Sequence, residues 1–499
     1  MLPELLSALA ARLGVTLDDH ARVTGISIDS RQTVPGDLFV ALNAARDGHD
    51  FIADAKARGA VGALVTRPSD LLPSILVEDT EGALTTLARQ YRDAYQGPVL
   101  ALTGSQGKTS TRGFIEAIMR QTAQHQSNAN ILVTRGNLNN QLGVPLTVSR
   151  LRAEHAFAVF ELGASAVGDI AHLASIVKPR YSALLNARAA HLEGFGSIAG
   201  VVQGKGEIID HTDLDGCCVL NADEPAFETW KARAGVRQVT TFGRTEADVT
   251  WSPQGDSRVV LTLRGQSFEV LLPTIGHHLM ENAAAACALT EAAGATIDDM
   301  IQGLESAVIE PGRMTPIRLP SLLLVDDTYN ASPEAVMAAI DWLASQPGRR
   351  VLILGGLAEL GQEEYQSMHQ LGVYARERGI ESLLTVAEGA PIAEGFGAKA
   401  LHFDSFETLA DELEAQLIHA DVVLVKGSRA SQMERVLGLR PVISVPVLDT
   451  GSAQPSHKQC KGWKVALGML IALLVGVVGL LAKPLSSLLG FTLSPRNAQ

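Results

Sequence analysis

The stretch that decides the fold is Val99-Leu100-Ala101-Leu102-Thr103-Gly104-Ser105-Gln106-Gly107-Lys108-Thr109. Residues 99–102 are apolar and predict a buried strand of a parallel sheet, and the apolar spacing within 114–119 predicts a helix behind it. A glycine-rich turn between a strand and a helix directs backbone N–H groups at phosphates, while its lysine and threonine meet the phosphate charge and magnesium. We therefore expect the residues from Gly104 to Ser110 to bind a nucleotide.

The spacing of this turn departs from the general GxxxxGK[ST] motif. Leu102 stands five positions before Gly107, and the nearer glycine is Gly104. A lone Gly-Lys-Thr occurs by chance in solvated loops, so the prediction depends on the strand before the turn and the helix after it.

Bulk composition sets limits on the fold and the partners. The chain has 499 residues, 46% of them hydrophobic, which is enough for about three domains on the usual size prior. A net charge of -13 argues against nucleic acid as a partner, because such a partner requires a basic face. The four cysteines form no CxxC pair for zinc, and with no visible signal peptide they indicate a reducing cytoplasm.

The C-terminal part has a different composition. Residues 465–482 are apolar or glycine without a charge and are flanked by lysines, which predicts a transmembrane helix over 463–483 after a linker over 451–462. More lysines precede the segment than follow it, so we expect the catalytic domains in the cytoplasm, anchored to the inner membrane. The alternative is a hydrophobic helix that packs on the protein itself.

Alternation of apolar runs with helical stretches predicts an α/β fold with parallel sheets. We expect an N-terminal domain over 1–95, a central domain over 96–313 and a third, doubly wound domain over 314–450. Beyond the first strand, the predicted strands of the last two domains are 156–160, 181–185, 217–220, 322–325, 351–354, 383–386 and 422–425.

Polar residues follow the strands of the central domain. Glu161 ends one strand and His191 lies just beyond the next, so both are expected at the carboxyl edge beside Thr109, where open α/β sheets bind ligands. Glu161 and Thr109 suit magnesium, although a single glutamate at a strand end is often only a solvated cap. His191 is as readily a structural residue, because magnesium seldom takes imidazole. Lys205 opens a helical stretch and, on residue type alone, is a surface lysine.

The ordered motifs resemble the Mur ligases, most of all the MurF type, over roughly residues 29–447. The stretches that carry the resemblance are 104–109, 136–140, 143–145, 161–164, 191–196, 205–207, 221–223, 311–313, 326–330 and 426–428.

This resemblance implies three domains: a small N-terminal α/β domain for the UDP moiety, a central P-loop ATPase domain and a C-terminal Rossmann-like domain. It implies an ATP-dependent amide ligase that uses Mg2+ and joins D-alanyl-D-alanine to UDP-N-acetylmuramoyl-tripeptide through an acyl phosphate, in peptidoglycan precursor synthesis. We also expect the catalytic part to be a monomer.

The resemblance also implies roles for single residues. The catalytic set would be Lys108, Glu161, His191 and Lys205. The metal ligands would be Thr109 and Glu161 at one magnesium and His191 at a second, with Lys205 present as a carbamate. Adenine, phosphate and ribose contacts would come from Asn282, Arg313 and Asp327. The substrate-binding candidates are Ser30, Arg31, Asp47, Gly48, His49, Asn137, Asn140, Asn330 and Lys426.

Four positions depart from the MurF pattern, and they keep alternatives open. Gly356-Leu357 stands where the family usually has Asp-Met, and Ser165, Leu279 and Ser332 also differ. One alternative is a MurF-like ligase with a different amine or acyl substrate. Another is a catalytically weakened, nucleotide-binding paralogue that acts as a membrane-tethered scaffold. A simple P-loop kinase or GTPase leaves the first domain unexplained.

Overall fold

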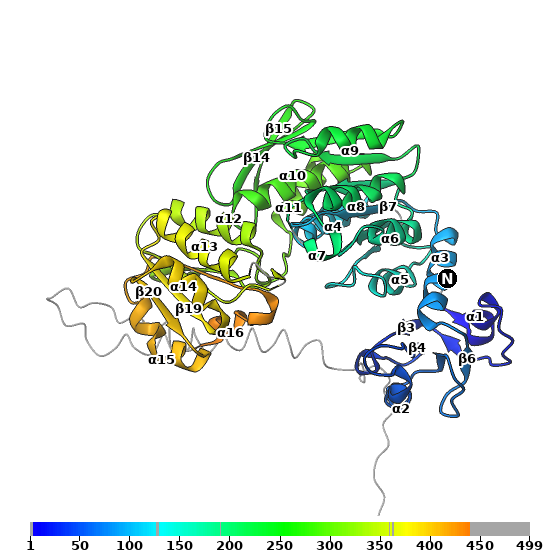
Figure 1. Ribbon diagram of the computed structural model, residues 1–499. Coiled ribbons are helices and arrows are strands. Elements are labelled where there is room, and N and C mark those ends of the chain that lie inside the picture. Colours follow the sequence, from blue (N-terminus) through cyan, green and yellow to red (C-terminus); the bar gives the residue numbers. More distant parts are fainter. Residues whose placement is uncertain (1–2, 126–128, 190, 359, 362–363, 440–499) are drawn as a thin grey trace, which may run out of the picture. The chain divides into compact units, whose positions relative to one another are not determined.

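The computed structural model describes residues 3–125, 129–189, 191–358, 360–361 and 364–439. Three larger sheets organise this part of the chain: a four-stranded sheet within 25–76, a nine-stranded sheet within 99–271 and a six-stranded sheet within 315–426 (Figure 1). A fourth, two-stranded antiparallel sheet pairs residues 4–5 with residues 22–23. Helices cover these sheets, and most strand pairs are parallel, so the predicted α/β class is confirmed.

The first sheet has the order β3-β4-β5-β6 and is parallel throughout. Because side chains alternate along a strand, Leu38 and Val40 of β4 pack with α1 and α3, while Phe39 packs with α2 on the other face. The elements are β1 Glu4–Leu5, α1 Leu6–Arg12, β2 Arg22–Val23, β3 Gly25–Ser27, η1 Ser30–Gln32, β4 Asp37–Val40, η2 Gly48–Phe51, α2 Ile52–Ala57, β5 Gly62–Val65, β6 Ser74–Leu76 and α3 Thr80–Ala94.

The central sheet has the order β15-β14-β13-β12-β11-β10-β7-β9-β8. Both faces of β7 are buried: Leu100 and Leu102 pack with α4, α10 and α11, and Val99 and Ala101 pack with helices that include α6 and α8. This double burial explains why the strand is an unbroken apolar run. The parallel strands are β7 Val99–Thr103, β8 Ile131–Val133, β9 Phe157–Glu161, β10 Tyr181–Leu184, β11 Cys217–Asn221 and β12 Gln238–Gly243. The helices are α4 Lys108–Gln124, α5 Gly143–Val148, α6 Asp169–Val177, α7 Leu192–Phe195, α8 Ile198–Asp210, α9 Phe227–Ala234, α10 His277–Ala292 and α11 Ile297–Glu305.

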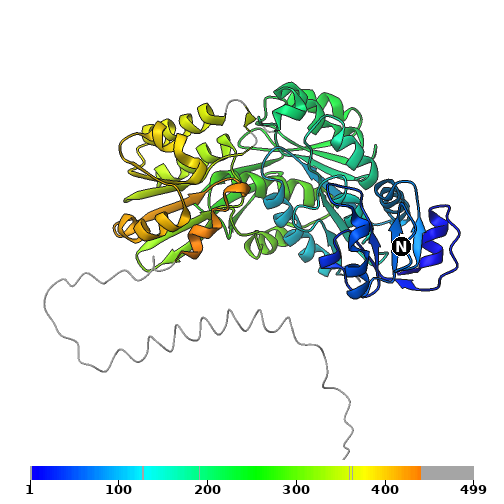
Figure 2. The ribbon, with the colours of Figure 1, turned by 60° about the horizontal axis from the view of Figure 1, so that its bottom comes forward.

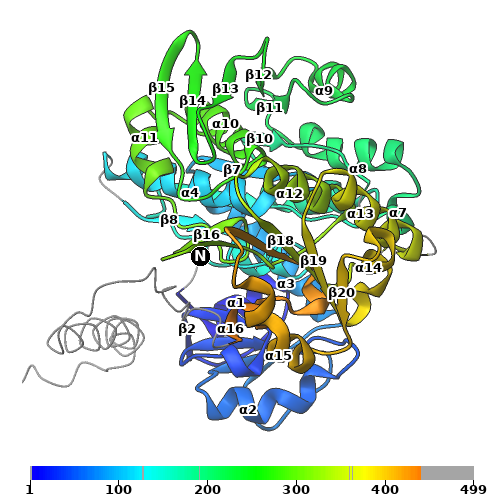
Figure 3. The ribbon, with the colours of Figure 1, turned by 90° about the vertical axis from the view of Figure 1, so that its left-hand side faces the viewer.

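An antiparallel extension of this sheet was absent from the sequence-based prediction. Strand β13 (Val249–Pro253) pairs parallel with β12, and β14 (Arg258–Leu263) and β15 (Gln266–Leu271) then follow antiparallel (Figure 3). Burial alternates along β14, because one face of the extension packs on the helical layer and the other faces solvent.

The third sheet has the order β16-β17-β21-β18-β19-β20, and only its β16–β17 pair is antiparallel. Its strands are coloured from yellow-green to orange in Figure 2. Leu352 and Leu354 of β18 pack with α12, α13 and α14, and Val351 and Ile353 pack with α15 and α16. The elements are β16 Thr315–Leu319, β17 Leu322–Asp327, α12 Pro333–Ser345, β18 Arg350–Leu354, α13 Glu364–Glu377, β19 Ser382–Val386, η4 Ala387–Gly389, α14 Ala390–Phe396, β20 Ala400–Phe403, α15 Phe406–Leu417, β21 Val422–Lys426, η5 Arg429–Ser431 and α16 Glu434–Gly438.

The predicted linker over 451–462 and the predicted membrane helix over 463–483 lie outside the described residues. Among the helices that are described, none is both long enough and apolar enough to cross a bilayer.

Candidate active site

Three adjacent strands of the central sheet, β10, β7 and β9, deliver polar groups to one edge. The loop 104–107, which we call the phosphate loop after its predicted role, follows β7. Asn186 follows β10, and Glu161 is the last residue of β9. Asn186 holds the loop: its Oδ1 accepts a hydrogen bond from the Gln106 N–H at 2.9 Å, and its Nδ2 donates to the Gln106 carbonyl at 3.2 Å. The loop is thus fixed directly before the N-terminus of α4, where backbone N–H groups favour an anion.

Gly107 gives the loop its sharp turn into α4. Its φ is +79°, in the left-handed region, and a Cβ at this position would lie 2.4 Å from Oδ1 of Asn282 on α10. Only glycine meets both conditions without strain. The structure therefore places Asn282, the predicted adenine contact, against the phosphate loop. Ser110, the last member of the predicted loop set, is buried within the first turn of α4.

Lys108 points back over the loop. Its Nζ donates hydrogen bonds to the carbonyl oxygens of Gly104 at 2.6 Å and of Ser105 at 3.1 Å. Burial lowers the pKa of Lys108 below its ordinary value; Glu161 counters this effect, and the charge of Arg313 adds to it. Two cations that repel one another beside backbone N–H groups form a site suited to a polyphosphate.

Glu161 is almost fully buried, with 1% of its surface exposed. Its Oε1 accepts hydrogen bonds from Thr109 Oγ1 at 3.2 Å and from Asn139 Nδ2 at 2.8 Å. Its Oε2 is buried and receives no hydrogen bond from any described residue, and Arg112 Nη1 lies 3.4 Å away.

A buried carboxylate oxygen without a donor fits a metal ion, because leaving it unsatisfied is otherwise costly. Magnesium commonly takes one or two protein oxygens and completes its shell with phosphate and water oxygens. Within the described part of the chain no group of three or more His, Cys, Asp or Glu residues could hold a metal. Thr109 and Glu161 offer a hydroxyl and a carboxylate, which are oxygen donors of the kind that magnesium takes.

The expectation from residue type that Lys205 is a surface lysine is wrong. It lies inside α8 rather than at the start of a helix, and only 1% of its surface is exposed. Its Nζ is 3.4 Å from the Ala164 carbonyl and 5.2 Å from the centre of the Phe195 ring. Burial, aided by the charge of Lys108, lowers the pKa of Lys205 to about 7. A large fraction of this amine is therefore neutral near neutral pH.

His191 has a strained backbone and an exposed side chain. Its φ is +55°, and its carbonyl accepts hydrogen bonds from the N–H groups of Gly194 and Phe195, both at 3.1 Å, at the start of α7. A non-glycine residue at positive φ is uncommon and is typical of functional loops. Its role at a second metal stays a prediction.

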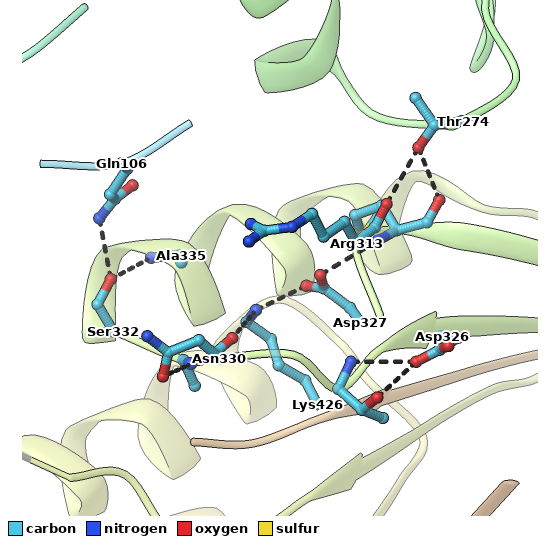
Figure 4. Close-up of polar contacts among 12 residues, drawn as sticks. Gln106, Thr274, Arg313, Asp326, Asp327, Asn330, Ser332, Ala335 and Lys426 are labelled. Carbon is cyan, nitrogen blue, oxygen red and sulfur yellow. Dashed lines mark hydrogen bonds and ion pairs between the residues drawn. The ribbon is translucent and has the colours of Figure 1, made fainter. Parts of the chain in front are cut away.

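The third sheet contributes a second polar cluster (Figure 4). Lys426 Nζ donates to Asp327 Oδ2 at 2.7 Å and to the Asn330 carbonyl at 2.9 Å, and it is 3% exposed. Asp327 Oδ1 accepts from the Met314 N–H at 3.2 Å. The Arg313 guanidinium lies 4.0 Å from the centre of the Tyr329 ring, and its buried Nε has no hydrogen-bond acceptor among the described residues. The predicted contacts Arg313, Asp327, Asn330 and Lys426 thus lie together.

One hydrogen bond joins the phosphate loop to the third sheet's first helix. Gln106 Nε2 donates to Ser332 Oγ at 2.9 Å (Figure 4). Ser332 is also the N-cap of α12, since its Oγ accepts from the Ala335 N–H at 3.3 Å.

The substrate-binding candidates of the first sheet lie on two loops at one edge, after the parallel strands β3 and β4. Ser30 is buried in η1, and Arg31 is mostly exposed and pairs with Asp29. Asp47 accepts hydrogen bonds from the His49 N–H at 2.9 Å, from His49 Nδ1 at 2.7 Å and from Arg67 Nη1 at 2.6 Å, and these donors lower its pKa far below the ordinary value.

Gly48 lies between Asp47 and His49 in the sequence and is closely packed. A Cβ at this position would lie 2.5 Å from the Leu42 nitrogen.

The asparagine-rich loop before α5 shows what the sequence analysis missed. Asn137 and Asn140 were predicted to bind substrate, and both are exposed; Asn140 Oδ1 caps the turn by accepting from the Gly143 N–H at 2.9 Å. It is Asn139 that donates to Glu161. Arg112 was missed as well, although its position four residues after Lys108 puts both on one face of α4.

Three family models match the chain. They are the Mur ligase middle domain over residues 102–290, the Mur ligase glutamate ligase domain over 312–429 and the Mur ligase family catalytic domain over 22–92. A UDP-N-acetylmuramoyl-tripeptide--D-alanyl-D-alanine ligase from Escherichia coli K12 is 39% identical over 450 residues, which cover 87% of this chain and 96% of that protein. The chain belongs to the Mur ligase family.

Other Mur ligases of the MurF type extend the likeness. The Haemophilus influenzae relative is 35% identical and covers 84% of this chain and 94% of its own length. A crystal structure of MurF from Acinetobacter baumannii has a TM-score of 0.79 at 32% identity, covering 87% of this chain and 98% of that one. MurF ligase from Thermotoga maritima in complex with ADP has a TM-score of 0.73 at 31% identity, covering 83% and 96%. The three-domain Mur ligase architecture is confirmed.

Proposed function

We propose that this chain is an ATP-dependent ligase of the MurF type, which joins D-alanyl-D-alanine to UDP-N-acetylmuramoyl-tripeptide in peptidoglycan precursor synthesis. The observation that carries the proposal is the contact between Thr109 of the phosphate loop and the buried carboxylate of Glu161. Likeness to MurF ligases over more than four-fifths of the chain supports the substrate pair. We assign residues 1–95 to the UDP moiety, 96–313 to ATP and 314–450 to the incoming amine.

ATP and Mg2+ are its cofactors, and the residues present fit both. Lys108 and the N–H groups of the loop would bind the ATP phosphates, with Asn282 toward the adenine and Arg313 and Asp327 toward phosphate and ribose. Thr109 and Glu161 would bind Mg2+, which neutralises charge on the phosphates.

The reaction needs an activated acid, because a carboxylate is a poor acyl donor. The terminal carboxylate of the tripeptide would take the γ-phosphoryl group, giving an acyl phosphate and ADP. The amine of D-alanyl-D-alanine would then attack the acyl carbon; the amide bond forms, and phosphate leaves with the proton of the amine. Lys108 would offset the charge during phosphoryl transfer. Residues of the third sheet would exclude water, which otherwise hydrolyses the acyl phosphate.

We also propose that the neutral amine of Lys205 forms an N–C bond to carbon dioxide and releases one proton to solvent, which gives a carbamate anion. With His191, this anion would bind a second metal. The reaction needs a neutral amine, and the lowered pKa of Lys205, about 7, supplies one. Burial of Lys205 against the Phe195 ring also favours the neutral amine, because an apolar surrounding disfavours the charged form.

A second candidate keeps the chemistry and changes the amine. Gly356 replaces the aspartate usual at this position of the family, and a Cβ there would lie 2.7 Å from the Cβ of Glu388. Glu388 therefore occupies the space that a larger residue at 356 requires. We infer that the third sheet would present a different group to the incoming amine.

Phosphate release from ATP tests both candidates. We expect release only when UDP-N-acetylmuramoyl-tripeptide and D-alanyl-D-alanine are both present, and none with Lys108→Ala. Lys231→Ala, which removes an exposed lysine from α9, is the control. Release with a different D-amino acid or dipeptide supports the second candidate, and no release with any pair contradicts both.

We further propose, from the sequence alone, that residues 463–483 anchor a cytoplasmic, monomeric catalytic part to the inner membrane. Truncation after Gly451 should leave ligase activity intact and abolish membrane association in flotation assays. Inactivity of the truncated protein would show that the segment is part of the catalytic fold.

A further inference from the structure

Arg112 is a buried cation between two carboxylates. It lies on α4, is 4% exposed, and forms an ion pair with Glu310 and a longer one, at 3.4 Å, with Glu161. Its Nη1 also donates to the Gly136 carbonyl at 2.7 Å. A single guanidinium thus contacts the end of β9, the loop after β8 and the connection that follows α11.

The contact with Glu161 concerns the oxygen that a metal would use. Oε1 is held by Thr109 and Asn139, whereas Oε2 receives no hydrogen bond from the described residues. At 3.4 Å, Arg112 Nη1 attracts Oε2 without bonding it, so the oxygen is oriented and still available.

The contact with Glu310 concerns the second half of the site. Glu310 is three residues before Arg313, whose guanidinium lies over Tyr329. Between them, Gly312 has a φ of +81°, and its carbonyl accepts from the Tyr329 N–H at 3.0 Å. Arg112 therefore fixes the start of the short segment that carries Arg313.

Charge neutralisation alone does not account for this arrangement. A lysine supplies the same charge, but its single ammonium cannot reproduce the planar fork that reaches Gly136, Glu310 and Glu161 together.

We propose that Arg112 is a positioning residue that orients the Glu161 carboxylate for magnesium and links it to the segment carrying Arg313. This inference rests on the function proposed above. It goes further because it makes Arg112 the residue that sets the orientation of the metal ligand Glu161.

Arg112→Lys tests the proposal because it keeps the charge and removes the fork. We expect Mg2+, titrated by calorimetry into the ADP-saturated protein, to bind about tenfold more weakly, which is about 1.4 kcal/mol. The thermal unfolding midpoint without ligands should change little. Arg120→Lys, on the exposed part of the same helix, is the matched control and should match the wild type.

Glu310→Gln, measured by itself, keeps the proposal testable if Arg112→Lys is unstable. If Glu310 orients Glu161 through Arg112, Glu310→Gln should weaken Mg2+ binding too. If Arg112→Lys is stable, the double variant should bind Mg2+ no more weakly than Arg112→Lys. Glu116→Gln, which removes the partner of Arg120, is the control for Glu310→Gln.

Wild-type Mg2+ affinity in both Arg112→Lys and Glu310→Gln would overturn the proposal. Failure of the wild type to bind ADP and Mg2+ would instead contradict the proposed function.

Discussion

The side-chain amide of Gln106 donates a hydrogen bond to the hydroxyl of Ser332 over 2.9 Å, which connects the phosphate loop with the N-cap of α12. Gln106 lies two residues before Lys108, and Ser332 lies two residues after Asn330, whose carbonyl accepts a hydrogen bond from Lys426. One pair of side chains therefore links the loop 104–107 to α12.

Replacing Ser332 separates its two contacts. Ser332→Ala should lower the free energy of unfolding by about 1 kcal/mol through loss of the N-cap, whereas Ser332→Asn keeps a capping side chain and should change it little. Urea unfolding with amide exchange of residues 334–336 measures this effect. Ser345→Ala, at the other end of α12, is the control, and equal exchange in the two alanine variants would contradict the capping role.

Gly107→Ala should abolish ADP binding without unfolding the protein. Alanine at a φ of +79° costs about 1 to 2 kcal/mol, and its Cβ would also collide with Asn282. Gly265→Ala is the matched control: its φ is +85°, and no heavy atom of the described residues beyond its chain neighbours lies within 4 Å of the added Cβ. Calorimetry with ADP should find binding in the control alone; binding in both variants would place the nucleotide elsewhere.

Lys205 should make stability depend on pH. Burial lowers its pKa to about 7 from the ordinary 10.5, so between these values the unfolded chain binds more protons than the folded one. The free energy of unfolding should therefore rise with pH over this window, by up to about 1.4 kcal/mol per pH unit. Below pH 7 Lys205 is protonated in both the folded and the unfolded chain, so the stability gained from its neutral form is lost.

Lys205→Met should flatten this rise in carbon-dioxide-free buffer, measured by urea unfolding between pH 7 and 9. Lys231→Met, at an exposed position, should keep it. A Lys205→Met profile that parallels the wild type would show that Lys205 has an ordinary pKa.

Asp47→Asn should weaken recognition of the UDP-linked substrate and leave nucleotide binding at the phosphate loop unchanged. His49 Nε2 accepts from the Thr66 N–H at 3.1 Å, so Nδ1 carries the proton and donates to Asp47. An amide loses the charge that also holds Arg67, and we expect KM for the UDP substrate to rise about tenfold with kcat retained. Steady-state kinetics against the exposed control Asp50→Asn checks this; a fall in kcat alone would place Asp47 outside the substrate site.

The predicted strands around the phosphate loop were found because both faces of the parallel sheets are buried, which leaves an apolar run in the sequence. The β13–β15 extension alternates polar and apolar residues with one face in solvent, and this weaker pattern was missed.

The sequence predicts which polar residues lie at strand ends, but it does not predict the contacts that side chains make inside loops. Glu161 and the loop 104–109 follow directly from their strands. The choice of Asn139 over Asn137 and Asn140 depends on the turn geometry of the loop, and no spacing in the sequence encodes that geometry. The burial of Lys205 depends on Phe195 and the Ala164 carbonyl, which only the packing of α8 brings together.

Oxygen transfer tests the central claim most directly. The tripeptide substrate carries 18O in its terminal carboxylate, and mass spectrometry follows the label during turnover with ATP and D-alanyl-D-alanine. If that carboxylate takes the γ-phosphoryl group at the loop 104–109, each molecule of inorganic phosphate released carries one 18O. Phosphate without label, formed while the amide product accumulates, would contradict the account.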